Sequence, residues 1–332
     1  MKFQYPDTAY NSNDMPVQSA SKWDNSLLDK FKLSNATLLH FNELSNQIPR
    51  TFSNKCELDD YQDNTIETPW DEKLFTKGQG NIWFRFFFLI GAFTEIFLTF
   101  LLPITFIAYI VVHFALYEEG IYDDSSYISD VILSLKFCFY FFGLSALYQL
   151  YYRKLAFING NVPFFIKLYR EYELCRQTGM VHIYKKNKEV FSAPFYEFDC
   201  YLASNPGNYG ELFYTMQLVH RYKGTKHTVD LGALIGNSAP PEEYYQLWNM
   251  MQQYMDISRP MPDNIMSEAY RHLDPTTAAY DKKTGRDSHF WRNMTQEEYE
   301  AELERREEAQ KSIPLEGEDI MRWKKPDQPF VA

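Results

Sequence analysis

The chain has 332 residues, with 33 Lys and Arg against 44 Asp and Glu, so its formal net charge is −11. That acidity excludes general nucleic-acid binding, because such proteins need a basic surface to neutralise phosphates. The four cysteines lie apart, without a C-x-x-C pair, which predicts neither a disulfide framework nor a zinc site. The N-terminal residues lack the apolar core of a signal peptide, so any membrane insertion has to rely on internal segments.

The first 80 residues are rich in Asn, Ser, Asp and Thr and show few periodic apolar runs. We expect a polar, loosely structured N-terminal arm over residues 1–80, able to pack on a later domain. Only residues 26–33 and 38–44 carry enough apolar side chains to predict short helices.

Residues 81–153 are predicted to form a two-helix transmembrane hairpin, with spans at about 86–116 and 131–152. The stretch 96–116 has 21 residues without Asp, Glu, Lys or Arg, and about 20 residues suffice to cross a bilayer. Pro103 is expected to kink the first span, because proline removes a backbone donor. A buried hairpin in the core of a globular protein is the alternative interpretation.

The loop between the spans predicts the orientation of the hairpin. Residues 117–130 contain five Asp and Glu and no Lys or Arg, whereas the flanking basic residues, such as Arg85 and Arg153, precede the first span or follow the second. By the positive-inside rule, both termini are expected to be cytoplasmic, and the location to be an inner (plasma) membrane.

Residues 154–258 are expected to form a cytosolic β-rich domain. Apolar and polar residues alternate in FYEFDCYL and LFYTMQLVHR, as half-buried strands require, and a turn cluster at 204–210 separates them. A helix follows Pro240 and Pro241, with an apolar stripe formed by Tyr244, Leu247, Trp248, Met251 and Met255. The predicted fold class is therefore α+β: the transmembrane hairpin plus an antiparallel β-meander closed by an amphipathic helix. This order of elements is similar to that of pleckstrin-homology-like (PH-like) domains.

Residues 259–332 are predicted to be a Pro-rich and charged C-terminal extension with a solvated helix. Thr295 and Glu298 form a capping-box pattern at its start. Glu302 with Arg306, and Glu307 with Lys311, are spaced for i,i+4 ion pairs on its surface.

No recognised catalytic motif occurs: G-x-G-x-x-G, the P-loop, G-x-S-x-G and H-E-x-x-H are all absent from the sequence. We therefore predict no catalytic, cofactor-binding or metal-binding residues, and we do not expect an enzyme. His220 and His227 could face each other across a hairpin and hold a metal, or they could be two surface residues of neighbouring strands.

Three residues are candidate functional positions. Glu95 is a carboxylate beside the apolar run, and a carboxylate inside a membrane is by default a functional candidate, although at the membrane boundary it would be solvated. Trp248 and Met251 could line a partner groove, or they could pack in the core against the sheet.

The chain resembles a family of uncharacterised bacterial transmembrane proteins in several segments, among them RQTGMVHIYKK, FYEFDCYLAS, EEYYQLWNMMQQYMD and HLDPTTAAYDKKTGR. The resemblance implies two transmembrane helices and the inner membrane of a Gram-negative bacterium. Some members are encoded near type VI secretion effector genes, which implies a role in secretion or immunity. The resemblance supplies no catalytic residues.

The sequence therefore predicts a membrane-anchored interaction protein, such as a type VI secretion accessory or an immunity protein. Its expected partners are the lipid bilayer and another protein, but no nucleic acid. One alternative is a membrane-bound enzyme that uses dispersed residues such as Asp199, His220 and His227. A second is a subunit of an oligomeric channel, which requires a homo-oligomer because two helices cannot enclose a pore.

Overall fold

The computed structural model describes residues 5–20, 36–53, 71–80, 168–207 and 210–324, together with scattered residues between 89 and 147. The chain divides into two compact units: a larger one formed by Met1–Lys77 and Arg170–Ala332, and a smaller one, Gly78–Tyr169, inserted between these two stretches.

Two four-stranded sheets make up the β-structure of the described residues, with strand orders β1-β6-β7-β8 and β2-β3-β4-β5. The strands are β1 Ala36–Leu39, β2 Leu74–Gly80, β3 Leu168–Cys175, β4 Met180–Lys185, β5 Lys188–Pro194, β6 Phe198–Pro206, β7 Leu212–His220 and β8 Gly224–Asp230. The α-helices are α2 Arg50–Ser53, α7 Pro241–Met255, α8 Glu268–Arg271, α9 Pro275–Thr284 and α10 Gln296–Lys311, and the 3-10 turns are η1 Ser12–Asp14, η4 Phe195–Glu197 and η5 Gly232–Leu234.

Turn residues set where the strands reverse. Lys186 and Asn187 both have positive φ between β4 and β5, which is the geometry of a tight hairpin turn. Gly179 turns β3 into β4 with φ +68°, and a Cβ atom there would lie 2.2 Å from the Thr8 carbonyl oxygen. Glycine is therefore required both by the backbone conformation and by the N-terminal segment that passes over this turn.

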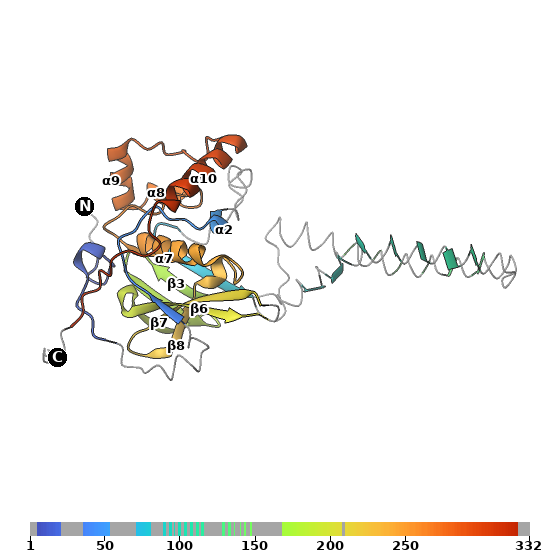
Figure 1. The fold of residues 1–332 in the computed structure, drawn as a ribbon, viewed down its shortest axis with the longest axis horizontal. Coiled ribbons are helices and arrows are strands. Elements are labelled where there is room, and N and C mark those ends of the chain that lie inside the picture. Colours follow the sequence, from blue (N-terminus) through green and yellow to red (C-terminus); the bar gives the residue numbers. More distant parts are fainter. Residues whose placement is uncertain are drawn as a thin grey trace. The chain divides into compact units, whose positions relative to one another are not determined.

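The main core lies where α7 packs against the sheets. The apolar stripe of α7 is buried, as its 3.6-residue period predicts, and Phe198, Cys200, Met216 and Leu218 face it from β6 and β7. Figure 1 shows α7 running along the sheets, with α8, α9 and α10 on its other side. Residues after Met255 thus form a helical layer that covers the outer face of α7.

The described part of the N-terminal region is integrated into this core. β1 pairs with β6 in antiparallel register, and Phe41 makes edge-to-face ring contacts with Phe195 and Trp248 at 5.4 and 5.1 Å. Nearer the N-terminus, Gln18 forms an isolated parallel β-bridge with Trp323. The short helix predicted over 38–44 is wrong: it is the end of a strand followed by an extended segment, and the helix predicted over 26–33 lies outside the described residues.

The predicted transmembrane hairpin is contradicted. Within the described residues, no helix combines the length and apolar character needed to cross a bilayer. The longest helices there, α7 and α10, have 15 and 16 residues, short of the roughly 20 that a span requires, and both carry polar faces. The predicted inner-membrane location and the cytoplasmic orientation of the termini depended on that hairpin, so the structure contradicts them as well.

Much of the two predicted spans, 86–116 and 131–152, lies outside the described residues. The described residues between 89 and 147 are helical, and large apolar side chains among them are exposed, including Leu89, Phe93, Ile104 and Val111.

The β-part of the predicted fold class also needs correction. The strands form two sheets instead of one meander, and each sheet is completed by a strand from the N-terminal region.

Candidate interaction groove

A hollow in the described part of the larger unit lies between the start of α7 and one face of α10. It has a volume of about 740 Å³. We call it the α7–α10 groove. Its floor is apolar and includes Ile48, Ile265, Trp291, Tyr299, Leu303 and Leu315. Its rim carries Glu242 and Glu243 from α7 and Glu300, Glu304 and Glu307 from α10.

α10 is positioned at its start by a capping box. The Thr295 hydroxyl accepts from the backbone N–H of Glu298, while the Glu298 carboxylate accepts from the backbone N–H of Thr295 at 2.9 Å. The predicted capping box is therefore confirmed. It satisfies two backbone donors at the helix end and fixes the direction in which α10 leaves the preceding loop.

Arg306 fastens the middle of α10 to the rest of the layer. Its guanidinium lies 4.5 Å from the centre of the Trp291 ring and donates to the Asp263 carbonyl oxygen at 2.6 Å. The predicted i,i+4 ion pair between Glu302 and Arg306 is present at 2.6 Å. Since Trp291 is almost fully buried, this stacking sets both the depth of the groove floor and the rotation of α10.

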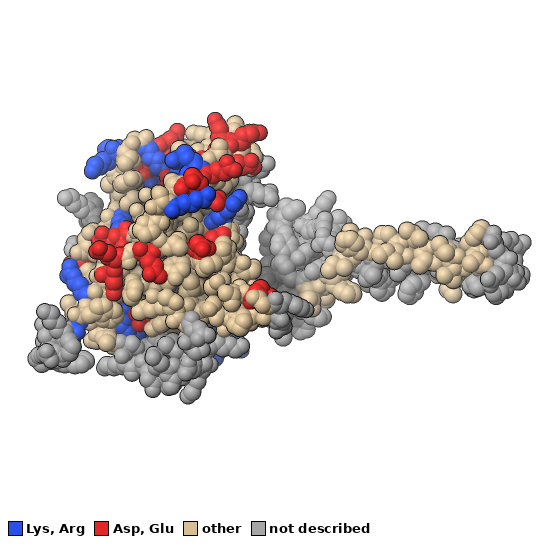
Figure 2. All heavy atoms as spheres, viewed as in Figure 1, with Lys and Arg blue, Asp and Glu red and all other residues tan. Residues whose placement is uncertain are grey.

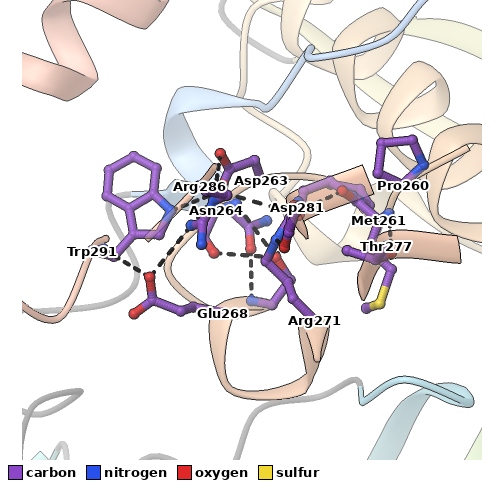
Figure 3. A network of polar contacts seen from close by, with 12 residues as sticks. Pro260, Met261, Asp263, Asn264, Glu268, Arg271, Thr277, Asp281, Arg286 and Trp291 are labelled. Carbon is purple, nitrogen blue, oxygen red and sulfur yellow. Dashed lines mark hydrogen bonds and ion pairs between the residues drawn. The ribbon is translucent and has the colours of Figure 1, made fainter. Parts of the chain in front are cut away.

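A partly buried polar network holds Trp291, one of the floor residues (Figure 3). Asp263 accepts from Arg286 at 2.8 Å and from the Trp291 indole N–H at 3.1 Å. Burial alone would raise the pKa of Asp263, but the hydrogen bond from Arg286 and the charges of Arg306 and Arg271 outweigh it, so the pKa lies below its ordinary value. Glu268 accepts from the backbone N–H of Trp291 at 2.8 Å, which ties the same loop to α8.

Asn264 contributes an unsatisfied donor to the groove lining. Its Oδ1 accepts from the Ser267 backbone N–H at 2.9 Å, but its Nδ2 has no acceptor among the described residues. The residue is 5% exposed. A buried amide without a partner costs about 1–3 kcal/mol, so an unpaired donor at a concave surface is a feature of binding sites as much as of structural turns.

The rim of the groove has an excess of negative charge. Five glutamates line it against three cations, Arg50, Arg306 and Lys311, and Figure 2 shows Asp and Glu side chains gathered over α10. Arg50 pairs with Glu307 at 3.4 Å. Lys311 pairs with Glu308 at 2.7 Å, and not with Glu307 as its i,i+4 spacing predicts. Glu242, Glu300 and Glu304 form no ion pair within the described part of the chain.

A second hollow, also about 740 Å³, lies beside α8 and α9 and is lined by Arg271, Lys282, Arg286 and Arg292 together with two carboxylates. Its central cations are already engaged. Arg271 donates to both oxygens of Asp281 at 2.9 and 2.6 Å, and Arg286 is held by Asp263. These arginines hold the helical layer together, and most of their charge is neutralised there.

Two of the three candidate residues from the sequence lie in the core. Trp248 is 1% exposed, and its indole N–H donates to the His40 carbonyl oxygen at 2.9 Å. Met251 is fully buried. Neither lines either hollow. Glu95 lies outside the described residues.

The dispersed residues of the enzyme alternative lie near one another but are each engaged in structural contacts. Asp199 forms a buried ion pair with Arg221 at 2.6 Å, and burial raises its pKa against the effect of that arginine. His220 contacts Glu197 at 3.1 Å, whereas His227 stacks on the Phe191 ring at 3.9 Å. The Phe191 ring also contacts His220, at 4.8 Å. No group of three or more potential metal ligands occurs among the described residues, and none of these side chains lines either hollow.

Sequence reasoning missed the groove, because α10 has only Tyr299 and Leu303 as large apolar residues in a charged helix. Their i,i+4 spacing was the available signal. The other floor residues come from segments far apart in the chain and meet only in the folded molecule.

Comparison with known proteins yields no match to a family model, to a curated protein or to a solved structure. The resemblance to bacterial two-helix transmembrane proteins therefore stays a prediction.

Proposed function

We propose that this protein is an interaction module that binds a polypeptide segment of a partner in the α7–α10 groove. The observation that carries the proposal is an apolar floor enclosed by a charged rim, which is the anatomy of a protein-binding surface. Partner recognition in secretion or immunity is a role of this kind, whereas the membrane anchor expected from the sequence is not part of the proposal.

The support comes from how the groove is built. Leu315 is 37% exposed at its edge, while Ile265 and Trp291 are nearly buried, so apolar surface extends from the core to the opening. Two arginines next to this surface, Arg286 and Arg306, donate to the Asp263 carboxylate, which restrains the segments that carry Trp291 and Leu303. A rigid apolar surface loses little entropy when it binds.

Site-specific photo-crosslinking tests the proposal. A photoreactive amino acid replaces Ile313, which lines the groove, in full-length protein expressed in its native host. We expect a discrete cross-linked adduct that disappears when Leu303→Glu places a carboxylate on the apolar floor. The matched control is Val190→Glu, at a position on β5 that is 52% exposed and outside the groove, and it should leave the adduct intact. Equal adduct in all three proteins, or none in any, would overturn the proposal.

A further inference from the structure

We infer that the α7–α10 groove selects a cationic amphipathic helix. This inference rests on the proposed function and names the chemistry of the partner segment. Its three supports are the charge of the groove walls, the elements that form them and the apolar floor.

The walls are two acidic ridges that flank one apolar floor. Glu300, Glu304 and Glu307 follow one another at i, i+4 and i+7 on α10, a ridge about 10 Å long at 1.5 Å per residue. Glu242 and Glu243 stand in the first turn of α7. Arg50 reaches Glu307, so the four wall carboxylates with no ion pair in the described structure are Glu242, Glu243, Glu300 and Glu304. Two of these accept a neutral hydrogen bond: Glu243 from the Thr51 N–H and Glu300 from the Gln296 amide, both at 2.8 Å. Glu242 and Glu304 accept none from the described residues.

Unpaired carboxylates along a groove attract Lys and Arg and repel acidic segments and anionic surfaces. The apolar floor at the same time requires apolar side chains on the segment that binds. Both demands are met by a segment with one apolar face and basic residues on its flanks.

The elements around the groove decide the conformation of that segment. All lining residues come from α7, α10, the first residue of α2 and loops, and none comes from a β-strand. An extended peptide would find no strand edge to pair with and would place unsatisfied N–H and C=O groups against an apolar floor. A helix satisfies its own backbone hydrogen bonds and offers apolar residues at i, i+3, i+4 and i+7.

Fluorescence anisotropy with full-length protein and four labelled peptides of about 20 residues tests the inference. One peptide has a Leu face flanked by Lys. The second replaces each Lys by Glu, the third replaces each Lys by Gln, and the fourth has the composition of the first in a scrambled, non-amphipathic order. We expect the Lys–Leu helix to bind at least about tenfold more tightly than the other three, and its affinity to fall as salt is raised.

Variants assign the binding to the groove. The triple change Glu242→Gln, Glu300→Gln and Glu304→Gln should weaken binding of the Lys–Leu helix by about tenfold, since each exposed pair contributes a factor of roughly 1.5 to 5. The control removes the same charge elsewhere, with Glu189→Gln, Glu211→Gln and Glu318→Gln, none of which lines the groove. It should change affinity less than twofold.

Two results overturn the inference: equal loss of affinity in both triple variants, or no preference for the Lys–Leu helix. If the photo-crosslink still depends on Leu303 in that case, the groove binds a segment of different chemistry, and only the inference fails. If the Leu303→Glu protein binds the Lys–Leu helix as well as the unmodified protein does, and the photo-crosslink is also absent, the proposed function fails with it.

Discussion

Arg176 is the residue that joins the β-structure to the helical layer. It is fully buried at the end of β3, and its guanidinium donates to both carboxylate oxygens of Asp274 at 3.0 and 3.1 Å. It also donates to backbone carbonyls at the end of α7 and after it: Tyr254, Asp256 at 2.8 Å and Arg259 at 2.7 Å. A planar fork with five donors can serve all these acceptors at once, and a lysine cannot.

Arg176→Lys is therefore expected to destabilise the protein strongly although it keeps the charge. Several buried carbonyls and one carboxylate lose their donors, and breaking a buried pair typically costs about 3–5 kcal/mol. Urea denaturation followed by tryptophan fluorescence measures the change. The matched control, Arg305→Lys on the exposed face of α10, should cost less than about 1 kcal/mol. A similar cost for both changes would contradict this account of Arg176.

Asp274 predicts an acid-sensitive contribution to stability. Burial acts to raise its pKa, but the charge and hydrogen bonds of Arg176 and the hydrogen bonds from Thr277 lower it below the ordinary value. The unfolded chain then binds a proton more readily than the folded one, so the stabilisation is complete above the unfolded pKa of about 3.9 and is lost as pH falls through the folded pKa. Asp274→Asn should lower stability at pH 7 and flatten its decline between about pH 5 and 2.

The experiment for Asp274 is a series of urea titrations at several pH values on both proteins. Glu308→Gln provides the control, because this exposed glutamate pairs with Lys311 on the surface of α10 and should leave the pH dependence unchanged. Parallel curves for the protein and its Asp274→Asn variant would contradict the assignment.

At the scale of the element, α10 depends on its first turn. It has 16 residues and few buried side chains, so packing contributes little to its helicity and capping contributes more. The Thr295 and Glu298 side chains cap each other reciprocally, which makes their effects interdependent. Fraying of this turn would remove Glu300 from the groove wall.

Thr295→Ala is expected to cost about 0.5–2 kcal/mol and to increase hydrogen exchange of the first α10 amides. In a double-mutant cycle with Glu298→Ala, the second change should cost little once the first is made. Asp274, the N-cap of α9, gives a comparison: exchange there should be unaffected by the Thr295 change. Additive effects of the two substitutions would mean that the reciprocal cap contributes nothing.

At the scale of the whole molecule, the larger unit is discontinuous in sequence. Its stretches 1–77 and 170–332 surround the smaller unit, and the chain enters and leaves through β2 and β3, which are hydrogen-bonded neighbours. The Arg176 N–H also donates to the Lys73 carbonyl oxygen at 2.7 Å, beside the ends of β2 and β3 that are farthest in sequence from the smaller unit. Strands β2 and β3 are thus paired as in a β-hairpin, and the smaller unit takes the place of the loop that would connect them.

Replacing residues 81–167 by an Asn-Gly turn should therefore leave the larger unit folded. The two strands are already adjacent, and this dipeptide favours a tight hairpin. Circular dichroism and thermal unfolding are the measurements, with a cooperative transition expected within a few degrees of that of the full chain. Loss of cooperative unfolding would show that the larger unit depends on the smaller one.

Sequence periodicity predicted the elements that depend on local patterns. The α7 stripe follows from a 3.6-residue period, and the cap of α10 from two residues three positions apart. The predictions were wrong where contacts between residues far apart in the sequence decide the structure. Residues 38–44 resemble a short helix, but Leu39 lies in β1 because Cys200 pairs with it from β6. A short apolar run by itself does not distinguish a helix from a strand.

The site was less predictable than the fold for a related reason. A groove is made by residues that no local pattern links: Ile48, Ile265 and Leu303 come from three separate segments. Trp248 and Met251 stood out because they are large and periodic, and those same properties place them in the core. The prediction of a transmembrane hairpin followed from apolar composition, which does not establish the length of a helix.

The pairing of β1 with β6 has a consequence for synthesis of the protein on the ribosome. Ala36 lies opposite Ala203, so β1 leaves the exit tunnel long before its partner has been translated. At about 5–20 residues per second, the delay is on the order of ten seconds. Throughout that time β1 has an unpaired edge that can join other nascent chains, so slower translation should increase aggregation and raise the demand for chaperones.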